Sequence, residues 1–400
     1  MPSVRIGLIA AAAAALLAGC STGAGGGEPT WVPAPSFKGE GQQPPVSPVV
    51  PQEQQPTAPG GPAGTPDPTA SKGGDPAVVA TKLTAPDGIA VLPDGTALVG
   101  ERTTGRIVLV QSGPHRPVTT VRTLSGVDTA GGGGLLDLAL SPNYSQDNLI
   151  FAYLSTPTDN RVVDFTMTGP VTPVFTGVPK GPNDNAGRIT FGSDGRLYVG
   201  TGDAGDAPLA LQHASLAGKI LRVTDIGRPA PDNPSPSSAI YTSGHRDIAG
   251  LCTDKASGLL FDVEVKGVNG LENVNLISAG ANYGWPTATT ASKGALTWMP
   301  KGLGAPGGCA IVNNNFYATS LDGRALLAAP LNVNGSVASI GKFTTYLKGV
   351  YGRLLNVVAA PDGTLWLTTS NRDGAGVPVA DDERVLHIPP PLPAGADYPG

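Results

Sequence analysis

The sequence predicts an all-β fold: a six-bladed β-propeller preceded by a signal peptide and a disordered Pro/Gly-rich stalk. Two observations predict the propeller. A unit made of an alternating apolar strand, a turn with Asp-Gly or a relative of it, and a second apolar strand recurs six times, about 50 to 60 residues apart. Little helical periodicity separates the units. A sandwich or a barrel is also rich in strands, but neither needs a hairpin repeated at blade length.

The six units predict the paired strands of six blades, because Asp-Gly between alternating strands is a strong hairpin signal. They read GIAVLPDGTALVGER from residue 88, LLDLALSPNYSQDNLIFAYL from 135, RITFGSDGRLYVGTGD from 188, GLCTDKASGLLFDVEV from 250, GCAIVNNNFYATSLDGRALLAAPL from 308 and LNVVAAPDGTLWLTTSN from 355. The innermost strands of a propeller converge on one axis. We therefore expect site residues at the ends of these strands and in the adjoining loops.

Residues 1–20 read as a lipoprotein signal peptide. Arg5 supplies a positive start, residues 6–17 form an apolar run too short to span a bilayer comfortably, and Leu-Ala-Gly-Cys follows, ending at Cys20. This quartet resembles the lipobox of bacterial lipoproteins, in which the cysteine is acylated; an ordinary signal with a structural cysteine is the alternative. We expect palmitate or a related lipid on Cys20 and a location on the extracytoplasmic face of the cell membrane.

The remaining chain divides into three parts. Residues 21–76 are dominated by Pro, Gly, Gln, Ser and Thr, and we expect a disordered linker, because such a segment buries too little apolar surface to fold. Residues 77–390 form the predicted propeller and residues 391–400 a tail. The net charge is −5, and no cluster of Lys and Arg with interleaved aromatics occurs, which argues against nucleic acid as a partner.

Two cysteines remain once Cys20 is assigned to lipid. Outside the cytoplasm Cys252 and Cys309 can form a disulfide, and two separate buried thiols are the alternative. No zinc motif accompanies them.

Several stretches together resemble the glucose/sorbosone dehydrogenases that use pyrroloquinoline quinone (PQQ), a family of six-bladed propellers. They are, in order, GGLLDLAL from residue 133, AGRITFGSDGRLYVGTGD from 186, SLAGKILRV from 215, YTSGHRDIAGL from 241 and NYGWP from 282. The lipobox, the stalk and STPTDNRV from residue 155 are similar to an actinobacterial lipoprotein branch of the family. The resemblance implies a secreted quinoprotein oxidoreductase that oxidises an aldose or similar alcohol at C1, with hydride transfer to PQQ and with calcium as a second cofactor.

The resemblance also implies site residues. Asp184 stands where the family has its catalytic histidine, and Arg188 follows in the same segment. Arg246 and Arg353 match arginines that hold PQQ, while Lys266 lies in the loop whose backbone binds calcium in the family, where its charge replaces or obstructs the ion. Other family positions carry different residues here: Leu355 for an arginine, Asn332 for a lysine and Ala204 for a glutamine. The sequence thus predicts a degenerate site, and it assigns no metal ligand.

Two other functions stay open. One is a non-catalytic propeller that binds a cell-envelope glycan, a protein or a small ligand. The other is a calcium-dependent, lactonase-like hydrolase that would recruit Asp184, Asn183, Asp203 and Glu101. We expect Asp203 in a solvated acidic turn, Glu101 in an exposed ion pair with Arg102, and His245 in a structural role.

Overall fold

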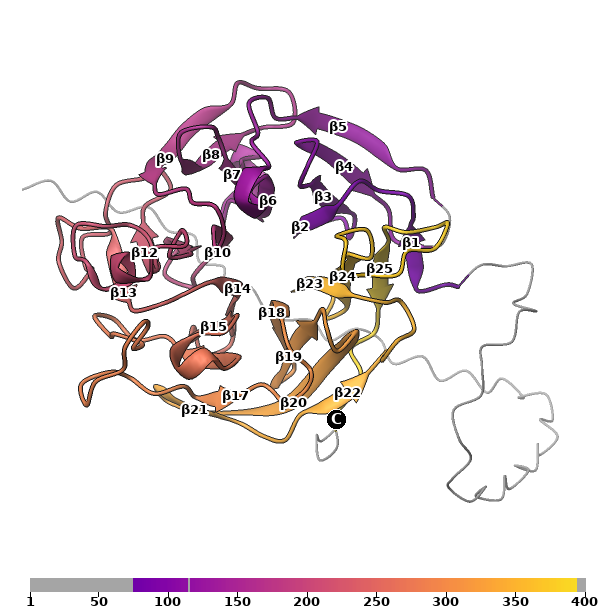
Figure 1. Ribbon diagram of the computed structural model, residues 1–400. Helices are drawn as coiled ribbons and strands as arrows, with labels where there is room; N and C mark the ends of the chain where they lie inside the picture. The colour runs from indigo at the N-terminus through magenta and orange to yellow at the C-terminus, as the bar shows by residue number, and fades with distance from the viewer. Residues whose placement is uncertain (1–74, 114–115, 394–400) are drawn as a thin grey trace, which may run out of the picture. The chain divides into compact units, whose positions relative to one another are not determined.

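Six antiparallel sheets surround a central axis (Figure 1). They are seen in a computed structural model, which describes residues 75–113 and 116–393. The sheets confirm the predicted all-β, six-bladed propeller. The predicted signal peptide, Cys20, nearly all of the stalk and most of the tail lie outside the described residues.

Each sheet contains four strands, and the fifth sheet contains one more. The first sheet is β2 (Pro86–Val91), β3 (Ala97–Glu101), β4 (Arg106–Val110) and β5 (Thr119–Thr123), and the second is β6 (Leu135–Leu140), β7 (Ile150–Ser155), β8 (Asn160–Phe165) and β9 (Thr172–Val178). The third is β10 (Ala186–Phe191), β11 (Leu197–Thr201), β12 (Lys219–Val223) and β13 (Ile240–Ser243), and the fourth is β14 (Ile248–Thr253), β15 (Leu260–Glu264), β16 (Asn273–Leu276) and β17 (Thr297–Trp298). The fifth is β18 (Pro306–Val312), β19 (Asn315–Ser320), β20 (Ala325–Asn334), β21 (Val337–Ile340) and β22 (Thr344–Tyr346), and the sixth is β23 (Leu354–Ala359), β24 (Leu365–Thr369), β25 (Val385–Ile388) and β1 (Val78–Ala80). Helical structure in the described residues is limited to α1 (Tyr144–Asp147) and three short 3-10 turns, Ala130–Gly132, Ala207–Leu211 and Val268–Gly270.

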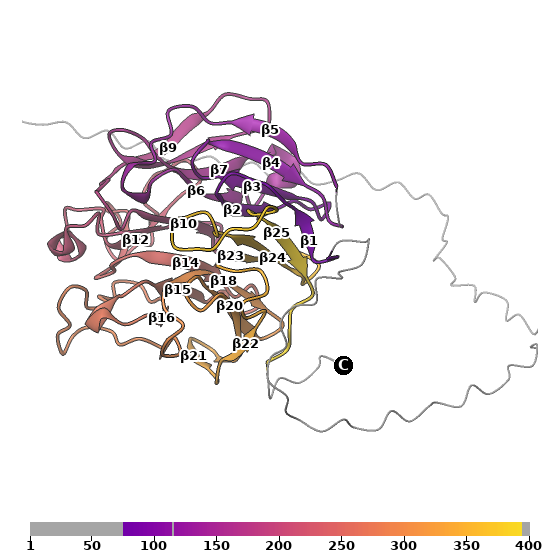
Figure 2. The same ribbon diagram turned by 45° about the vertical axis from the view of Figure 1, so that its right-hand side comes forward.

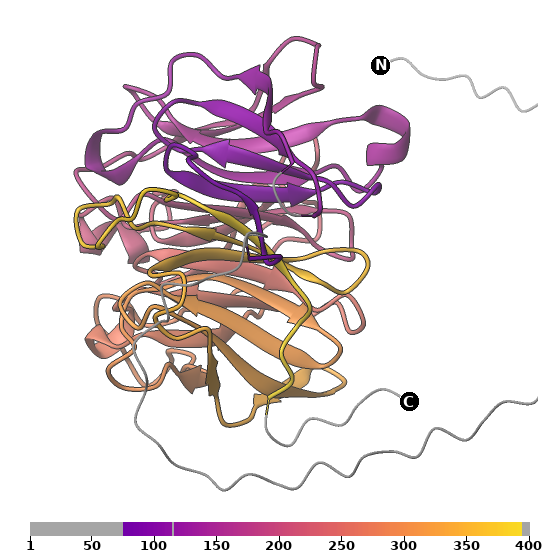
Figure 3. The same ribbon diagram turned by 90° about the vertical axis from the view of Figure 1, so that its right-hand side faces the viewer.

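The innermost strands form a closed ring. The strands β2, β6, β10, β14, β18 and β23 each contact the next one, and β23 contacts β2. Each of them belongs to one of the six predicted units, which supply the inner hairpins of the six blades. The last blade is completed from the other end of the described chain, because β1 pairs with β25, with Val78 opposite Leu386. Turned views show the C-terminal strands beside the first strands where the ring closes (Figures 2 and 3).

The Asp-Gly turns work as the sequence predicts. Gly95, Gly195 and Gly363 all have a positive φ, between 69° and 83°, which glycine adopts without steric cost. The preceding aspartate caps the turn in each case: Asp94 Oδ1, for example, accepts the Thr96 N–H at 2.9 Å. The same contact recurs at 2.9 Å in the third blade and at 3.0 Å in the sixth.

Glycine also permits close packing at the axis. A Cβ on Gly88 would lie 2.5 Å from the Cα of Asp137 on the neighbouring inner strand. Any side chain there would push two blades apart, so glycine sets how closely β2 approaches β6.

Cys252 and Cys309 form a disulfide. Cys252 lies on β14 and Cys309 on the adjacent inner strand β18, so the bond joins the fourth and fifth blades near the axis. This resolves the alternative that the sequence left open in favour of pairing.

No helix among the described residues is long and apolar enough to cross a membrane.

Candidate functional site

Three of the predicted site residues lie just before inner strands begin. Asp184 precedes β10 by two residues, Arg246 precedes β14 by two, and Arg353 precedes β23 by one. The later halves of all six inner strands line an axial cavity of about 600 Å³, which includes neither Asp184 nor Arg246. The loops that carry these residues therefore gather at the end of the axis away from that cavity.

Asp184 and Arg246 form the centre of the site. Nη2 of Arg246 lies 3.2 Å from Oδ2 of Asp184, and both side chains are partly exposed, by 25% and 18% respectively. Nη1 of Arg246 donates to the backbone oxygen of Lys266 at 3.3 Å. The structure thus brings together three of the predicted site residues, from the loops before β10, before β14 and after β15.

Trp285 and Asp203 complete this cluster. The Arg246 guanidinium carbon lies 5.1 Å from the centre of the Trp285 ring, within cation–π range. The indole Nε1–H donates to Oδ2 of Asp203 at 2.8 Å. Asp203 is 2% exposed, so the prediction of a solvated turn is wrong. Its burial raises the pKa of the carboxyl group against the opposing hydrogen bonds from Gly205 and Trp285.

The glycines around this turn are needed for close approach. A Cβ on Gly202 would lie 1.8 Å from the backbone oxygen of Asp184. Asp184 itself has a φ of 50°, in the left-handed region that non-glycine residues rarely occupy. The GTGDAG stretch from residue 200 thus shapes the backbone around Asp184.

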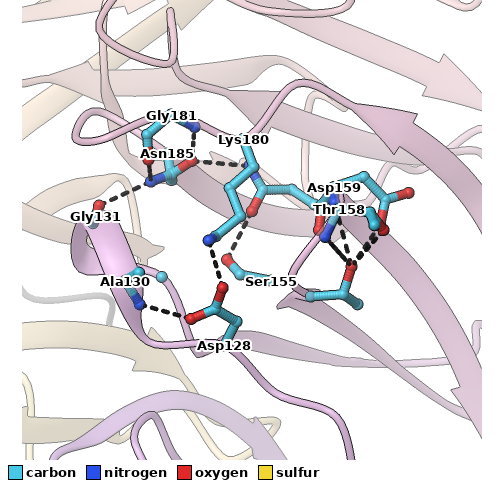
Figure 4. A network of polar contacts seen from close by, with 12 residues as sticks. Asp128, Ala130, Gly131, Ser155, Thr158, Asp159, Lys180, Gly181 and Asn185 are labelled. Carbon is cyan, nitrogen blue, oxygen red and sulfur yellow. Dashed lines mark hydrogen bonds and ion pairs between the residues drawn. The ribbon is translucent and has the colours of Figure 1, made fainter.

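A buried polar network holds the segment that carries Asp184 (Figure 4). The side chain of Asn185 accepts the Gly181 N–H at 2.9 Å and donates to the Gly131 oxygen at 2.7 Å and to the Gly181 oxygen at 3.1 Å. Nδ2 of Asn160 donates to Oδ1 of Asn185 at 3.0 Å. Nearby, the Lys180 ammonium lies 2.7 Å from the Asp128 carboxylate, which ties the same segment to the loop between β5 and β6.

Asp247 is a site residue that sequence reasoning missed. It follows Arg246 directly in GHRD, and that adjacency to a matched arginine was the available signal. Burial, and then the charge of Asp184, raise the pKa of Asp247 to about 7. The charge of Asp184 also raises the pKa of Asp203, and Asp203 raises that of Asp247, while Arg246 opposes both shifts.

Lys266 takes part in the site through its backbone, and a role for its charge stays a prediction. Its N–H donates to Oε2 of Glu272 at 2.6 Å, and its side chain is exposed. With its oxygen engaged by Arg246, the loop is fastened on both sides.

Arg188 lies at the axis, 9% exposed. It donates to Asp87 Oδ1 at 2.8 Å, to the Leu136 oxygen at 2.9 Å and to the Ala249 oxygen at 2.7 Å. It thus ties β10 to residues of β2, β6 and β14. No contact among the described residues joins it to Asp184 or Arg246, and its catalytic role stays a prediction.

Arg353 belongs to a separate ion-pair network. Its guanidinium lies 2.8 Å from Asp322 and 2.8 Å from Asp373. Burial opposes the charge, but the hydrogen bonds to these carboxylates outweigh it and raise the pKa of Arg353. Its role toward a cofactor also stays a prediction.

Glu101 differs from the sequence expectation. It is fully buried and pairs with Arg106 at 2.8 Å rather than with Arg102 in solvent. Thr84 and Thr104 supply further hydrogen bonds. Glu101 is therefore engaged in its own network and does not join Asp184, Asn183 and Asp203 as a ligand of one calcium ion, as the lactonase-like alternative required.

The fold and the site define a six-bladed propeller with an arginine, carboxylates and an aromatic ring clustered at one end of its axis. Comparisons with known proteins identify its family. The sequence profile of the family "Glucose / Sorbosone dehydrogenase" matches residues 83–307. The chain belongs to the glucose/sorbosone dehydrogenase family, which confirms the resemblance at that level.

Solved and curated relatives agree. The PQQ-bound aldose sugar dehydrogenase from Streptomyces coelicolor is 37% identical, with a TM-score of 0.72 over 78% of this chain and 96% of that chain. An oxidoreductase described as a glucose dehydrogenase, from Thermus thermophilus, is also 37% identical, with a TM-score of 0.71 over 78% of this chain and 98% of that one. Quinoprotein glucose dehydrogenase B from Acinetobacter calcoaceticus is 30% identical over 254 residues, 53% of this chain and about half (52%) of the relative.

Proposed function

We propose that this protein oxidises an aldose or similar alcohol at C1 with PQQ as its cofactor. The observation that carries the proposal is the Asp184–Arg246 pair at the axial end of the propeller, beside Trp285 and Lys266. Membership of the dehydrogenase family and the PQQ-bound relative support the same conclusion.

The residues present suit a planar, multiply charged anion such as PQQ, which carries three carboxylates. Nε of Arg246 is buried and has no hydrogen-bond partner among the described residues, so a strong donor is unsatisfied at the site. Arg246 and the exposed Lys266 ammonium would hold carboxylates of the cofactor through charge-assisted hydrogen bonds. The Trp285 ring, packed on Arg246, fixes the orientation of the guanidinium.

In this proposal PQQ supplies the two-electron acceptor, and the protein supplies positioning and the proton acceptor. Arg246 orients the carboxylate of Asp184, which is partly exposed and takes the proton of the substrate hydroxyl. Asp203 and Trp285 hold the adjoining wall through their mutual hydrogen bond.

We further propose that the protein is a lipoprotein of the actinobacterial branch, anchored through Cys20 on the extracytoplasmic face of the membrane, with its sugar substrate in that compartment. The Leu-Ala-Gly-Cys quartet and the Pro/Gly-rich segment after it support this proposal. Metabolic labelling with a palmitate analogue tests it, since Cys20→Ser should abolish labelling.

The enzymatic proposal is tested by titrating PQQ, with and without calcium, into the detergent-purified full chain and by following PQQ-dependent dye reduction with a panel of aldoses. Arg246→Ala should weaken PQQ binding by about 10- to 150-fold, the equivalent of one charge-assisted contact. Asp184→Asn should leave PQQ bound while lowering the turnover rate at least about 100-fold.

The exposed residues Arg228 and Asp225 provide matched controls, as Arg228→Ala and Asp225→Asn. Absence of PQQ binding by the unaltered protein would refute the proposal. Saturable binding of an envelope glycan without turnover would then favour the non-catalytic alternative.

A further inference from the structure

A second polar cluster lies inside the fourth blade and includes His245, the residue before Arg246. On the β15–β16 hairpin, Asp262 is paired with Asn275 and Glu264 with Asn273. Because side chains alternate along a strand, these four residues share one face of the hairpin. His245 adds its imidazole from the segment before β14. All five side chains are buried, with no more than 1% exposed.

The cluster contains more hydrogen-bonding groups than it satisfies. Neither carboxylate oxygen of Asp262 accepts a hydrogen bond, and Oδ1 of Asn273 also has no partner among the described residues. His245 is the one ion-pair partner that the described residues offer to Asp262 and Glu264. Two buried carboxylates facing a single imidazole are short of positive charge, which is costly in a dry interior.

The oxygen and nitrogen atoms of the cluster converge, and Nδ1 of His245 forms a hydrogen bond with Oε1 of Glu264 that a bound ion would replace. Nδ1 of His245 and one carboxylate oxygen each of Asp262 and Glu264 all lie within 4.8 Å of one another. The His245 nitrogen is 3.2 Å from Oδ2 of Asp262, close to the edge of about 3.3 Å in a tetrahedron of zinc ligands. A Cβ on Gly267 would lie 2.4 Å from both Glu264 Oε2 and Asn273 Oδ1, so these oxygens are neighbours and glycine leaves room beside them.

The imidazole is held as metal-binding histidines are. Its Nε2 lies 2.8 Å from the Thr242 hydroxyl, and its ring stacks on Tyr283 with a centroid distance of 4.8 Å. An oxygen partner on one ring nitrogen orients the other nitrogen toward a ligand. Here the oriented nitrogen is Nδ1, which faces the two carboxylates.

We propose that this cluster binds a divalent transition-metal ion, Zn²⁺ or Mn²⁺, through His245 Nδ1, the carboxylates of Asp262 and Glu264, and Asn273 Oδ1. Two carboxylates balance the charge of the ion, and a mixed imidazole and oxygen set suits these metals. The site uses side chains buried inside the blade, and so differs from the backbone calcium loop that the family resemblance implies. It does not depend on PQQ.

The position of the cluster gives the ion a structural role. His245 is adjacent to Arg246 in the chain, and Glu264 is two residues from Lys266. An ion at the cluster would therefore hold in place the starts of the two loops that carry the Arg246 and Lys266 side chains at the axial site. Because the ligands are buried, the ion would enter as the blade folds.

The test uses the full chain, expressed and refolded with Zn²⁺ or Mn²⁺, dialysed and analysed for metal by mass spectrometry without any quinone. We expect about one ion per chain, and a midpoint of thermal unfolding higher by roughly 5 °C at a hundredfold excess over Kd. Asp262→Asn and Glu264→Gln should each remove most of the bound metal, while Asp225→Asn at an exposed position retains it.

If the variants fail to fold, X-ray absorption of the unaltered metal-loaded protein decides the question. One nitrogen with oxygen ligands around the ion supports the proposal. Three outcomes would overturn it: no retained metal, full retention of the metal by the Asp262 and Glu264 variants, or a coordination shell without nitrogen. The cluster would then be a set of buried side chains that share protons through hydrogen bonds. PQQ titration of the same samples separates this outcome from failure of the dehydrogenase proposal.

Discussion

Replacing Asn185 by alanine tests how the segment of Asp184 is held in place. The Asn185 side chain takes part in four hydrogen bonds: with Gly131, with Asn160 and two with Gly181. Asn185 is 4% exposed, so water does not readily replace these contacts. A buried polar group left without a partner costs about 1 to 3 kcal/mol. If two of the partners are left without a hydrogen bond and away from water, Asn185→Ala lowers the free energy of unfolding by about 2 to 6 kcal/mol.

The measurement is urea unfolding followed by tryptophan fluorescence, with Asn143→Ala as the control. Asn143 is exposed and its side chain makes no capping hydrogen bond with α1, so its loss should cost less than about 0.5 kcal/mol. The double variant Asn160→Ala/Asn185→Ala should be less destabilised than the sum of the single variants, because the two side chains bond each other. Equal stability of Asn185→Ala and the control, or strict additivity in the double variant, would refute the reasoning.

Two further predictions concern stability. Cys252→Ser should lower the free energy of unfolding by about 4 kcal/mol relative to the oxidised protein, since the bond closes a loop of 57 residues. The measurement is urea unfolding of the variant and of the reduced unaltered protein. The prediction is contradicted if both have the same urea midpoint as the oxidised protein. Burial raises the pKa of Asp137 to about 7 despite the nearby Arg188, so the folded state keeps a proton that the unfolded chain releases near pH 4, and the Asp137 contribution to stability falls as pH rises from about 4 to 7. Asp137→Asn should flatten that part of the profile in thermal unfolding, and an unchanged slope would count against the assignment.

The sequence predicted the ring well because its information is local and repeated. An Asp-Gly turn between alternating strands needs only about ten residues to be recognised, and the six inner hairpins are where the units lie. The pairing of β1 with β25 was not predicted, because β1 is three residues long and its partner lies at the other end of the described chain.

The site was predicted less completely, because its residues lie in loops without periodicity. Asp184 and Arg246 were found by motif, and the structure places them in contact. Burial of Asp203 and Glu101 was missed, since each lies at the end of a strand or just beyond it, where the pattern no longer tells inside from outside. Asp262 and Asn273 were not recognised as neighbours of His245, because only the hairpin register puts them on one face.

The closure of the ring also sets the order of events during synthesis. Strand β1 leaves the ribosome first among the described strands, and its partner β25 leaves last. About 300 residues separate them, which corresponds to roughly 15 to 60 s of translation. Throughout that interval the outermost position of the sixth blade has no partner, and the contact between β2 and β23 that completes the inner ring is absent for most of it. The propeller therefore cannot close before β25 has been synthesised, and its most distant contacts form last.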